Sequence, residues 1–393
     1  MTSPRAESPI ATSSRSRPRV PRVLVVFGTR PEAIKLAPVI ADLRCAANSG
    51  NFEICVCVTA QHREMLDQVL GIFDVQPEFD LNLMQPGQTL PELTARLVPA
   101  LSQVFAAVKP ALSIVQGDTT TTFCASLASF YSGVPIAHVE AGLRTRDPQA
   151  PFPEEMNRVL TSRLAALHFA PTPLAAFNLE REGIERDRIE VTGNTGIDAL
   201  LQVRTALGRG TLKSGAPRLL RAGVKLILVT AHRREILGPA LAGICRGLAE
   251  LSRRPDVHIV WPVHPNPEVR KTVLETEFDP AGVSLIEPLD YVSFIDLLAT
   301  AYFVITDSGG VQEEAPSLGK PVLVLRDHTE RPEGVEAGTA RLVGTGSACL
   351  VREAGRLLDD PEEYQRRSEI KNPYGDGRAS QRISERIRVF LEC

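Results

Sequence analysis

Small, cationic and acidic residues directly follow several apolar segments of this chain. The apolar run at 23–27 leads into GTRPEAIK, which carries Gly28, Arg30 and Lys35. The glycine permits a tight turn, Pro31 fits the first turn of a helix, and the two cations add charge where helical N–H groups already favour anions. This pattern predicts an anion-binding site, with a solvated helix start as the alternative. It matches neither GxGxxG nor GxxxxGK, so it indicates no dinucleotide-binding or Walker motif.

Acidic residues follow later apolar segments in the same way. Asp118 lies in QGDTTTTF and Glu140 lies in HVEAGLRT, each after a strand-like run. Glu154 and its neighbour Glu155 precede a helical pattern in PFPEEMNR. A single acid at the end of a strand usually caps a helix or forms a salt bridge. Several acids from neighbouring loops instead favour a shared cleft and proton-transfer chemistry.

The second half of the chain carries a histidine and a glycine turn. His232 follows the run KLILVT, and a neutral histidine can move protons near pH 7. The SGG turn at 308–310 follows YFVIT and opens a helix, where glycines let a phosphate approach the backbone N–H groups. We expect Glu313 and Glu314 in the first turn of that helix, either as favourable charges at its positive end or as acceptors for ribose hydroxyls. Arg331 is a further candidate for a phosphate.

Short β-branched runs alternate with longer amphipathic stretches along the chain. The first series of predicted strands is 23–27, 54–59, 111–116, 135–140 and 167–170. The second series is 225–230, 257–263, 284–288, 302–306 and 321–326. Alternating β and α segments with nearly continuous apolar strands predict parallel sheets covered on both faces, and two series predict two Rossmann-like domains. In such sheets, ligands bind beyond the carboxyl ends of the strands, where the residues named above lie.

The composition limits the classes of function. With 393 residues and 43% hydrophobic content, the chain suits two domains. Its net charge of -3 gives no sign of a nucleic-acid partner, and no segment reaches the ~18–20 apolar residues of a membrane span. Seven cysteines without a CxxC pair predict reduced core thiols and a cytoplasmic location. Residues 1–21, rich in Ser, Arg and Pro, predict a disordered lead, with an organelle transit peptide as the alternative.

Cations and phosphate-binding turns on two facing domains predict a nucleoside diphosphate in an interdomain cleft, with chemistry on the attached group. Eleven ordered motifs, covering roughly residues 22–393, resemble the bacterial non-hydrolysing UDP-N-acetylglucosamine 2-epimerases. The motifs are GTRPEAIKLAPVI, TAQHREMLDQVL, QGDTTTTF, HVEAGLRT, PEEMNR, TGNTGIDAL, TAHRRE, PVHPNP, TDSGGVQEEAPSLGKPVLVLRD, TERPEGVEAGT and NPYGDGRAS.

The resemblance implies a fold, an assembly and an activity. The fold would be α/β, with two Rossmann-like domains of the glycosyltransferase-B type and the active site in the interdomain cleft. We expect the lead at 1–21, an N-terminal domain of 22–193 plus a crossover helix at 379–393, and a UDP-binding domain of 194–378. The protein would be a homodimer that interconverts UDP-GlcNAc and UDP-ManNAc.

The resemblance also implies residue roles. Catalysis would be carried by Asp118, Glu140, Glu154 and His232. The UDP-sugar would contact Arg30, Lys35, Asp118, Glu140, His232, Phe294, Ser308, Gly309, Gly310, Glu314 and Arg331. Leu289 occupies a place where some members have a glutamine that contacts the base, so base recognition there would fall to backbone groups.

Some members of this family bind a second UDP-GlcNAc as an allosteric activator beside the active site. The matching positions in this chain are Gln61, Glu64, Glu154, Arg233 and His264. Glu64 and Gly87, however, stand where certain activated members have glutamine and arginine. Loss of a cation beside the activator's phosphates would weaken this regulation.

The chemistry implied by the resemblance suits these residue types. The C2 proton of the sugar is not adjacent to a carbonyl, so its direct removal is very unfavourable. Either NAD oxidises a neighbouring carbon, for which the chain offers no GxGxxG, or UDP leaves C1 as a carboxylate removes H2, giving 2-acetamidoglucal. We therefore expect no cofactor and, without a DxD motif or a ligand cluster, no metal.

Several related functions remain open at this point. They are a hydrolysing relative that releases UDP and ManNAc, a retaining glycosyltransferase, a catalytically silent UDP-sugar sensor and an epimerase for a modified UDP-HexNAc. A UDP-ManNAc product would supply ManNAc units for a cell-envelope polysaccharide.

Overall fold

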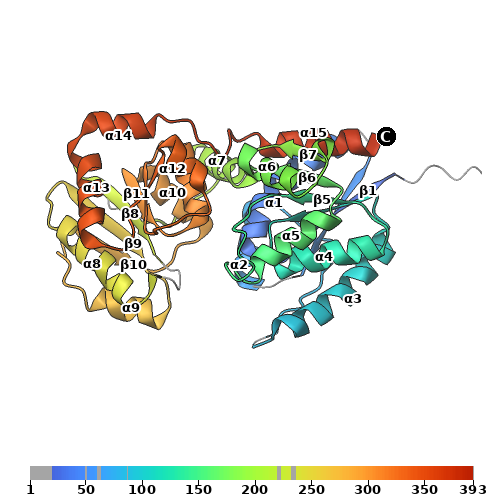
Figure 1. Cartoon of the computed structure of the whole chain (residues 1–393), viewed down its shortest axis with the longest axis horizontal. Coiled ribbons are helices and arrows are strands. Elements are labelled where there is room, and N and C mark those ends of the chain that lie inside the picture. The colour runs from blue at the N-terminus through green and yellow to red at the C-terminus, as the bar shows by residue number, and fades with distance from the viewer. Residues whose placement is uncertain are drawn as a thin grey trace, which may run out of the picture.

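The chain folds into two α/β lobes that lie side by side (Figure 1). In this computed structural model, the described residues are 20–48, 51–59, 63–85, 87–218, 223–231 and 236–392, with only the backbone of Arg63, Glu64 and Glu392. The lead at 1–21 therefore lies almost wholly outside the described residues.

Within the described ranges, seven parallel strands form the sheet of the first lobe, in the order β3-β2-β1-β4-β5-β6-β7. The strands are β1 (Arg22–Phe27), β2 (Glu53–Val58), β3 (Phe79–Asp80), β4 (Leu112–Gln116), β5 (Ile136–Val139), β6 (Leu167–Ala170) and β7 (Ile189–Val191). The helices are α1 (Arg30–Ala47), α2 (Arg63–Ile72), α3 (Leu90–Val108), α4 (Thr120–Tyr131), α5 (Glu154–Leu164) and α6 (Pro173–Arg181).

Strand β1 shows why the strands of this sheet are apolar on both faces. Val23 and Val25 belong to the apolar cluster beneath α1, whereas Leu24 and Val26 belong to the cluster beneath α3 and α4. Successive side chains of a strand point to opposite faces, and helices cover both faces of a parallel sheet. An almost unbroken apolar run is therefore needed at this position.

The second lobe contains six parallel strands among the described residues, in the order β10-β9-β8-β11-β12-β13. The strands are β8 (Lys225–Thr230), β9 (Val257–Pro262), β10 (Val283–Ile286), β11 (Phe303–Thr306), β12 (Val322–Val324) and β13 (Ala340–Leu342). The helices are α8 (Pro239–Ser252), α9 (Pro267–Leu274), α10 (Tyr291–Thr300), α11 (Gly309–Glu314), α12 (Pro332–Ala337), α13 (Ser347–Asp359) and α14 (Pro361–Ser368).

Helix α7 (Thr195–Gly208) lies between the two lobes (Figure 1). It packs against α1 of the first lobe and against α10 and α11 of the second. One apolar cluster joins Leu36 of α1, Leu200 of α7 and Ile295 of α10, so the junction is a packed interface. The last helix, α15 (Ala379–Glu392), returns from the second lobe and packs against α1 and α7.

The predicted α/β class, with two parallel sheets, is confirmed, and each predicted strand is present. The strands that the sequence did not indicate are β3, β7 and β13, which have only two or three residues and lie toward the edges of their sheets. One local prediction is wrong. Helix α11 begins at Gly309, so Glu313 and Glu314 are its fifth and sixth residues and do not lie in its first turn.

Candidate active site

The GTRPEAIK segment forms the turn from β1 into α1, and its glutamate has a structural role. Thr29 caps α1, and Glu32 Oε2 accepts from the backbone N–H groups of Thr29 at 2.7 Å and Gly28 at 3.0 Å. Glu32 is 1% exposed, and its other oxygen accepts from the hydroxyls of Thr119 at 2.7 Å and Thr122 at 2.9 Å. This capping box therefore ties the loop after β1 to the loop after β4.

Gly28 is required for a different reason from the one its sequence suggested. A Cβ atom at this position would lie 2.2 Å from Thr59 Oγ1 and 2.6 Å from Thr121 Oγ1. The two hydroxyls also contact each other at 3.0 Å in the buried interior. A side chain is therefore excluded at this position because neighbouring loops approach closely, and not mainly because the turn requires a special backbone conformation.

Two cavities adjoin in the cleft between the lobes. The larger, of about 710 Å³, is lined from both lobes by Arg30, Pro31, Ile34, Lys35, Met65, Thr230, Ala231, Pro262, His264, Pro265, Pro288, Leu289, Tyr291, Phe294, Ser308, Gly310, Val311 and Glu314. The smaller, of about 440 Å³, is lined by first-lobe residues that include Gln116, Asp118, Glu140, Glu154 and Asn157. Pro31 and Lys35 line both cavities, so a ligand could extend from one into the other.

Lys35 and Glu140 form an ion pair where the two cavities meet. Glu140 Oε2 also accepts from Gln116 Nε2 at 3.1 Å. Burial opposes the charge of Lys35, but the carboxylates of Glu140 and Glu313 outweigh it and raise its pKa. Burial likewise opposes the charge of Glu140, but Lys35 and the more distant Arg331 hold its pKa below the usual value. Both groups are therefore charged at neutral pH.

The backbone of Glu140 is unusual. Its φ is 64°, in the left-handed region that residues other than glycine seldom adopt. The residue follows directly after β5, and the turn directs its side chain toward Lys35. Backbone strain of this kind is concentrated at functional sites.

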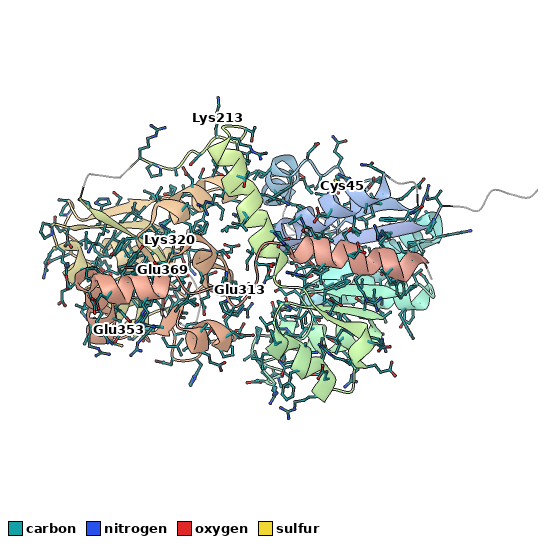
Figure 2. The ribbon with its side chains drawn as sticks, turned by 90° about the horizontal axis from the view of Figure 1, so that it is seen from above. Cys45, Lys213, Glu313, Lys320, Glu353 and Glu369 are labelled. Atoms are coloured by element: carbon teal, nitrogen blue, oxygen red, sulfur yellow. The ribbon has the colours of Figure 1, made fainter. Side chains whose placement is uncertain are left out.

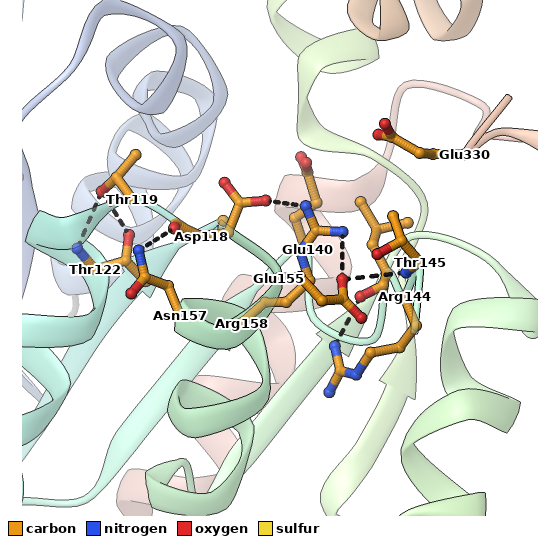
Figure 3. Close-up of polar contacts among 12 residues, drawn as sticks. Asp118, Thr119, Thr122, Glu140, Arg144, Thr145, Glu155, Asn157, Arg158 and Glu330 are labelled. Atoms are coloured by element: carbon orange, nitrogen blue, oxygen red, sulfur yellow. Dashed lines mark hydrogen bonds and ion pairs between the residues drawn. The ribbon is translucent and has the colours of Figure 1, made fainter. Parts of the chain in front are cut away.

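Asp118, which follows β4, is held in place by two residues of helix α5 (Figure 3). Arg158 donates to its carboxylate at 2.5 Å, and Asn157 Nδ2 donates to its backbone carbonyl at 2.9 Å. Arg158 is buried and also contacts Glu155, which accepts from the backbone of the 145–146 turn. Burial and the charge of Glu140 raise the pKa of Asp118, although Arg158 opposes the shift.

The second lobe contributes a buried arginine and two neighbouring glutamates. Arg331 Nε donates to Glu313 at 2.7 Å, and Nη1 contacts Glu330 at 3.1 Å. The guanidinium lies against Gly309, where a Cβ atom would be 3.5 Å from Nη2. Glu314, the next residue along the helix, instead lines the larger cavity, and burial raises the pKa of its carboxyl to about 8.

The other predicted site residues fall into two groups. Arg30, Leu289, Phe294, Ser308, Gly310 and His264 line the larger cavity, and Glu154 lines the smaller one. His232, Gln61 and Arg233 lie outside the described residues, as does the side chain of Glu64. Gly87 is described and has a φ of 70°.

Several polar residues of the site were not singled out from the sequence as site residues. They are Gln116, Asn157, Arg158, Asn194 and Tyr291. Arg158 and Asn157 stand in the quoted PFPEEMNR motif, one helical turn after Glu154, and this spacing places them on the same face of α5 as Glu154. Asn194 bonds to Glu140 of the first lobe and Glu313 of the second, and the ring of Tyr291 contacts Phe73 of the first lobe, so local sequence carries no signal for these contacts.

Two further properties concern the described residues alone. Among them, no group of three or more His, Cys, Asp or Glu side chains could hold a metal ion. Within the same ranges, no helix is both long and apolar enough to cross a membrane.

Comparison with known proteins gives a consistent answer. The family whose model matches residues 44–388 is UDP-N-acetylglucosamine 2-epimerase. The UDP-N-acetylglucosamine 2-epimerase of Salmonella typhimurium is 52% identical over 374 residues, which span 94% of this chain and 99% of the relative. The crystal structure of UDP-GlcNAc 2-epimerase from Neisseria meningitidis bound to UDP-GlcNAc has a TM-score of 0.87 at 47% identity, covering 94% of this chain and 100% of that one.

A more distant structure bears on the fold alone. The glycotransferase of kitacinnamycin has a TM-score of 0.64 at 14% identity and covers 95% of this chain and 100% of its own. The predicted glycosyltransferase-B type of fold and the predicted family are thus confirmed. This chain belongs to the UDP-N-acetylglucosamine 2-epimerase family.

Proposed function

We propose that this protein catalyses the reversible C2 epimerisation of UDP-GlcNAc to UDP-ManNAc. The observation that carries the proposal is the meeting of two unlike cavities at Lys35. A cavity with cations and aromatic side chains suits a nucleoside diphosphate. The adjoining cavity, lined by Asp118, Glu140 and Glu154 besides the capping residue Glu32, suits proton transfer on the attached sugar. The family relationship and the UDP-GlcNAc in the Neisseria meningitidis structure agree with this substrate.

The reaction proceeds by elimination and re-addition. A carboxylate takes the proton from C2 as the C1–O bond to UDP breaks, and a double bond forms between C1 and C2 in 2-acetamidoglucal. UDP then re-forms its bond to C1 as a proton arrives at C2 on the opposite face. Asp118, Glu140 and Glu154 share this acid–base work, because proton transfer from two faces requires more than one group. His232 assists at the phosphate or the sugar.

The departing diphosphate needs charge stabilisation. Arg30 and Lys35 line the larger cavity, and the guanidinium of Arg331 lies against the 308–310 turn. Prearranged cations stabilise charge that develops on the leaving group. Retention of UDP also requires a closed cleft, which two lobes that close over the ligand can provide.

The uridine is bound between apolar side chains. Leu289, Tyr291 and Phe294 line the larger cavity together with Pro262, Pro265 and Pro288. Leu289 has no polar side-chain atom, so backbone groups would read the base. The carboxyl of Glu314, in the same cavity, would accept from the ribose hydroxyls.

Regulation and assembly extend the proposal. A second UDP-GlcNAc would bind beside the active site near Glu154 and His264, which line the smaller and the larger cavity respectively. The protein would act as a cytoplasmic homodimer. Two exposed aromatic side chains near the end of α4, Phe130 and Tyr131, support a contact with a second copy. The product would supply ManNAc units for a cell-envelope polysaccharide.

A hydrolysing reaction is the alternative, because it shares the elimination step and differs only in letting water add to the glycal. Proton NMR of the purified protein with UDP-GlcNAc in D2O, without added cofactor, separates the two. We expect UDP-ManNAc with deuterium at C2 of both sugars. Free ManNAc with UDP would identify the hydrolysing reaction, and unchanged UDP-GlcNAc would contradict both.

A further inference from the structure

A chain of buried polar side chains crosses the junction between the two lobes. It runs from Lys35 through Glu140, Asn194 and Glu313 to Arg331. Lys35 and Glu140 belong to the first lobe, Asn194 caps α7 between the lobes, and Glu313 and Arg331 belong to the second. Figure 2 shows Glu313 where the two lobes meet. This row of side chains thus begins at the proton-transfer cavity and ends beside the 308–310 turn.

Asn194 connects the two carboxylates. Its Nδ2 donates to Glu313 Oε2 at 2.9 Å and, over a longer distance of 3.4 Å, to Glu140 Oε2. Its Oδ1 accepts from the backbone N–H of Gly196 at 2.8 Å, which fixes the amide so that the nitrogen faces the carboxylates. Only 3% of Asn194 is exposed, so water cannot replace these donors. A buried carboxylate that loses its donors is strongly destabilised.

Glu313 is anchored on every side. Its Oε1 accepts from Arg331 at 2.7 Å, and its backbone carbonyl accepts from Asn372 at 2.7 Å. The backbone carbonyl of Tyr374 in turn accepts from Asn194 N at 2.8 Å, so the crossover segment before α15 also holds this group. Glu313 does not line either cavity of the cleft. Its carboxylate therefore faces other protein groups, and any effect on the reaction must pass through them.

We propose that Asn194 and Glu313 are positioning residues that fix the carboxylate of Glu140 relative to Arg331 across the junction of the lobes. This inference rests on the proposed function, in which Glu140 transfers a proton and Arg331 binds the diphosphate. Asn194 holds Glu140, Glu313 holds Asn194, and Arg331 anchors Glu313. The distance from Glu140 to the leaving group is thereby set by two side chains that line neither cavity. A misplacement of about 1 Å in such a group can cost ~100-fold in rate.

The first variant to test is Asn194→Ser. Serine retains an acceptor for the start of α7, so the fold should be preserved. Its hydroxyl lies one bond closer to the backbone than Asn194 Nδ2 and so does not reach the two carboxylates as the amide does. We expect kcat for UDP-GlcNAc to fall by about 10- to 100-fold, while KM and the Kd for UDP change by less than about 3-fold. Glu313→Gln should lower kcat in the same range. The kcat of the double variant should be no lower than that of the slower single variant, because both substitutions break the same connection between Glu140 and Arg331.

Glu353→Gln is the matched control. Glu353 is also buried and paired with arginines, at 2.9 Å to Arg341 and 3.3 Å to Arg352, but it lies on α13 in the outer part of the second lobe (Figure 2). This variant should lower the Tm and leave kcat within about 2-fold.

The inference is overturned if Asn194→Ser retains normal kcat, or if Glu313→Gln affects only the Tm, as Glu353→Gln does. Wild-type activity is read first: an inactive wild type contradicts the proposed function, whereas an active wild type with active variants contradicts only this inference.

Discussion

The two adjoining cavities of the cleft differ in the kind of side chain that lines them. In the smaller one, Asp118 and Glu140 are paired with the first-lobe cations Arg158 and Lys35. The larger one is formed mainly by apolar and aromatic side chains of the second lobe, among them Leu289 and Phe294. Under the proposed function, this difference would divide the work, with the first lobe supplying proton transfer and the second recognising the nucleotide. Substitutions in the two cavities should therefore affect different kinetic constants.

The largest effect is expected for Asp118→Asn. The amide keeps the shape of the side chain but cannot take up a proton, so turnover should fall by at least ~100-fold, the usual range for a lost acid or base. Binding of UDP, measured by calorimetry, should persist because the larger cavity is unchanged. Asp359→Asn, on the outer surface of the second lobe, is the control. Nearly normal turnover of Asp118→Asn would remove Asp118 from the catalytic groups.

The next effect concerns the support of that acid. Arg158→Met removes the cation that opposes the rise in the pKa of Asp118, whose other charged neighbours are Glu140 and Lys35. The pKa of Asp118 should therefore rise further, and the limb of the pH–rate profile that it controls should move to higher pH. We expect kcat at neutral pH to fall by about 10-fold, with a smaller change for Arg158→Lys, which keeps the charge. An unchanged profile from pH 5 to 10 would show that the ion pair serves only the fold.

A smaller effect, of the opposite kinetic type, is expected in the larger cavity. Phe294→Ala removes an aromatic surface against which the base can stack, an interaction worth about 1–3 kcal/mol. KM for UDP-GlcNAc should rise by about 10-fold while kcat stays within about 2-fold. Titration of UDP against the same variant gives an independent reading. A fall in kcat with constant KM would contradict the division between the cavities.

The sequence predicted the loops of the site better than the contacts within it. Asp118, Glu140 and the 308–310 turn all follow strands, and the carboxyl ends of parallel strands meet at one edge of a sheet. The positions of neighbouring side chains could not be derived in this way. Glu313 and Glu314 are adjacent in the chain, yet one faces Asn194 at the junction and the other lines a cavity. A helix turns by about 100° per residue, so the first residue of α11 decides which acid faces the ligand.

The smallest expected effect concerns one acid of each cavity, Glu140 in the smaller and Glu314 in the larger, whose pKa values shift in opposite directions. Ion pairing with Lys35 holds the pKa of Glu140 below its usual value, whereas burial raises that of Glu314 from 4.5 to about 8. Ionisation of Glu314 therefore disfavours the folded state above pH 4.5, and this penalty grows until about pH 8. Glu314→Gln removes the penalty, so its Tm should exceed that of the wild type at pH 9, by about 1 °C for each kcal/mol in a protein of 393 residues, and should match it near pH 4.5. Thermal unfolding of both proteins at pH 4.5, 7 and 9 tests the sign of this difference in Tm, and a variant at an exposed position, Glu369→Gln, is the control. If Glu314→Gln were less stable than the wild type at pH 9, Arg30 and Lys35 would stabilise the Glu314 carboxylate as fully as Lys35 stabilises that of Glu140.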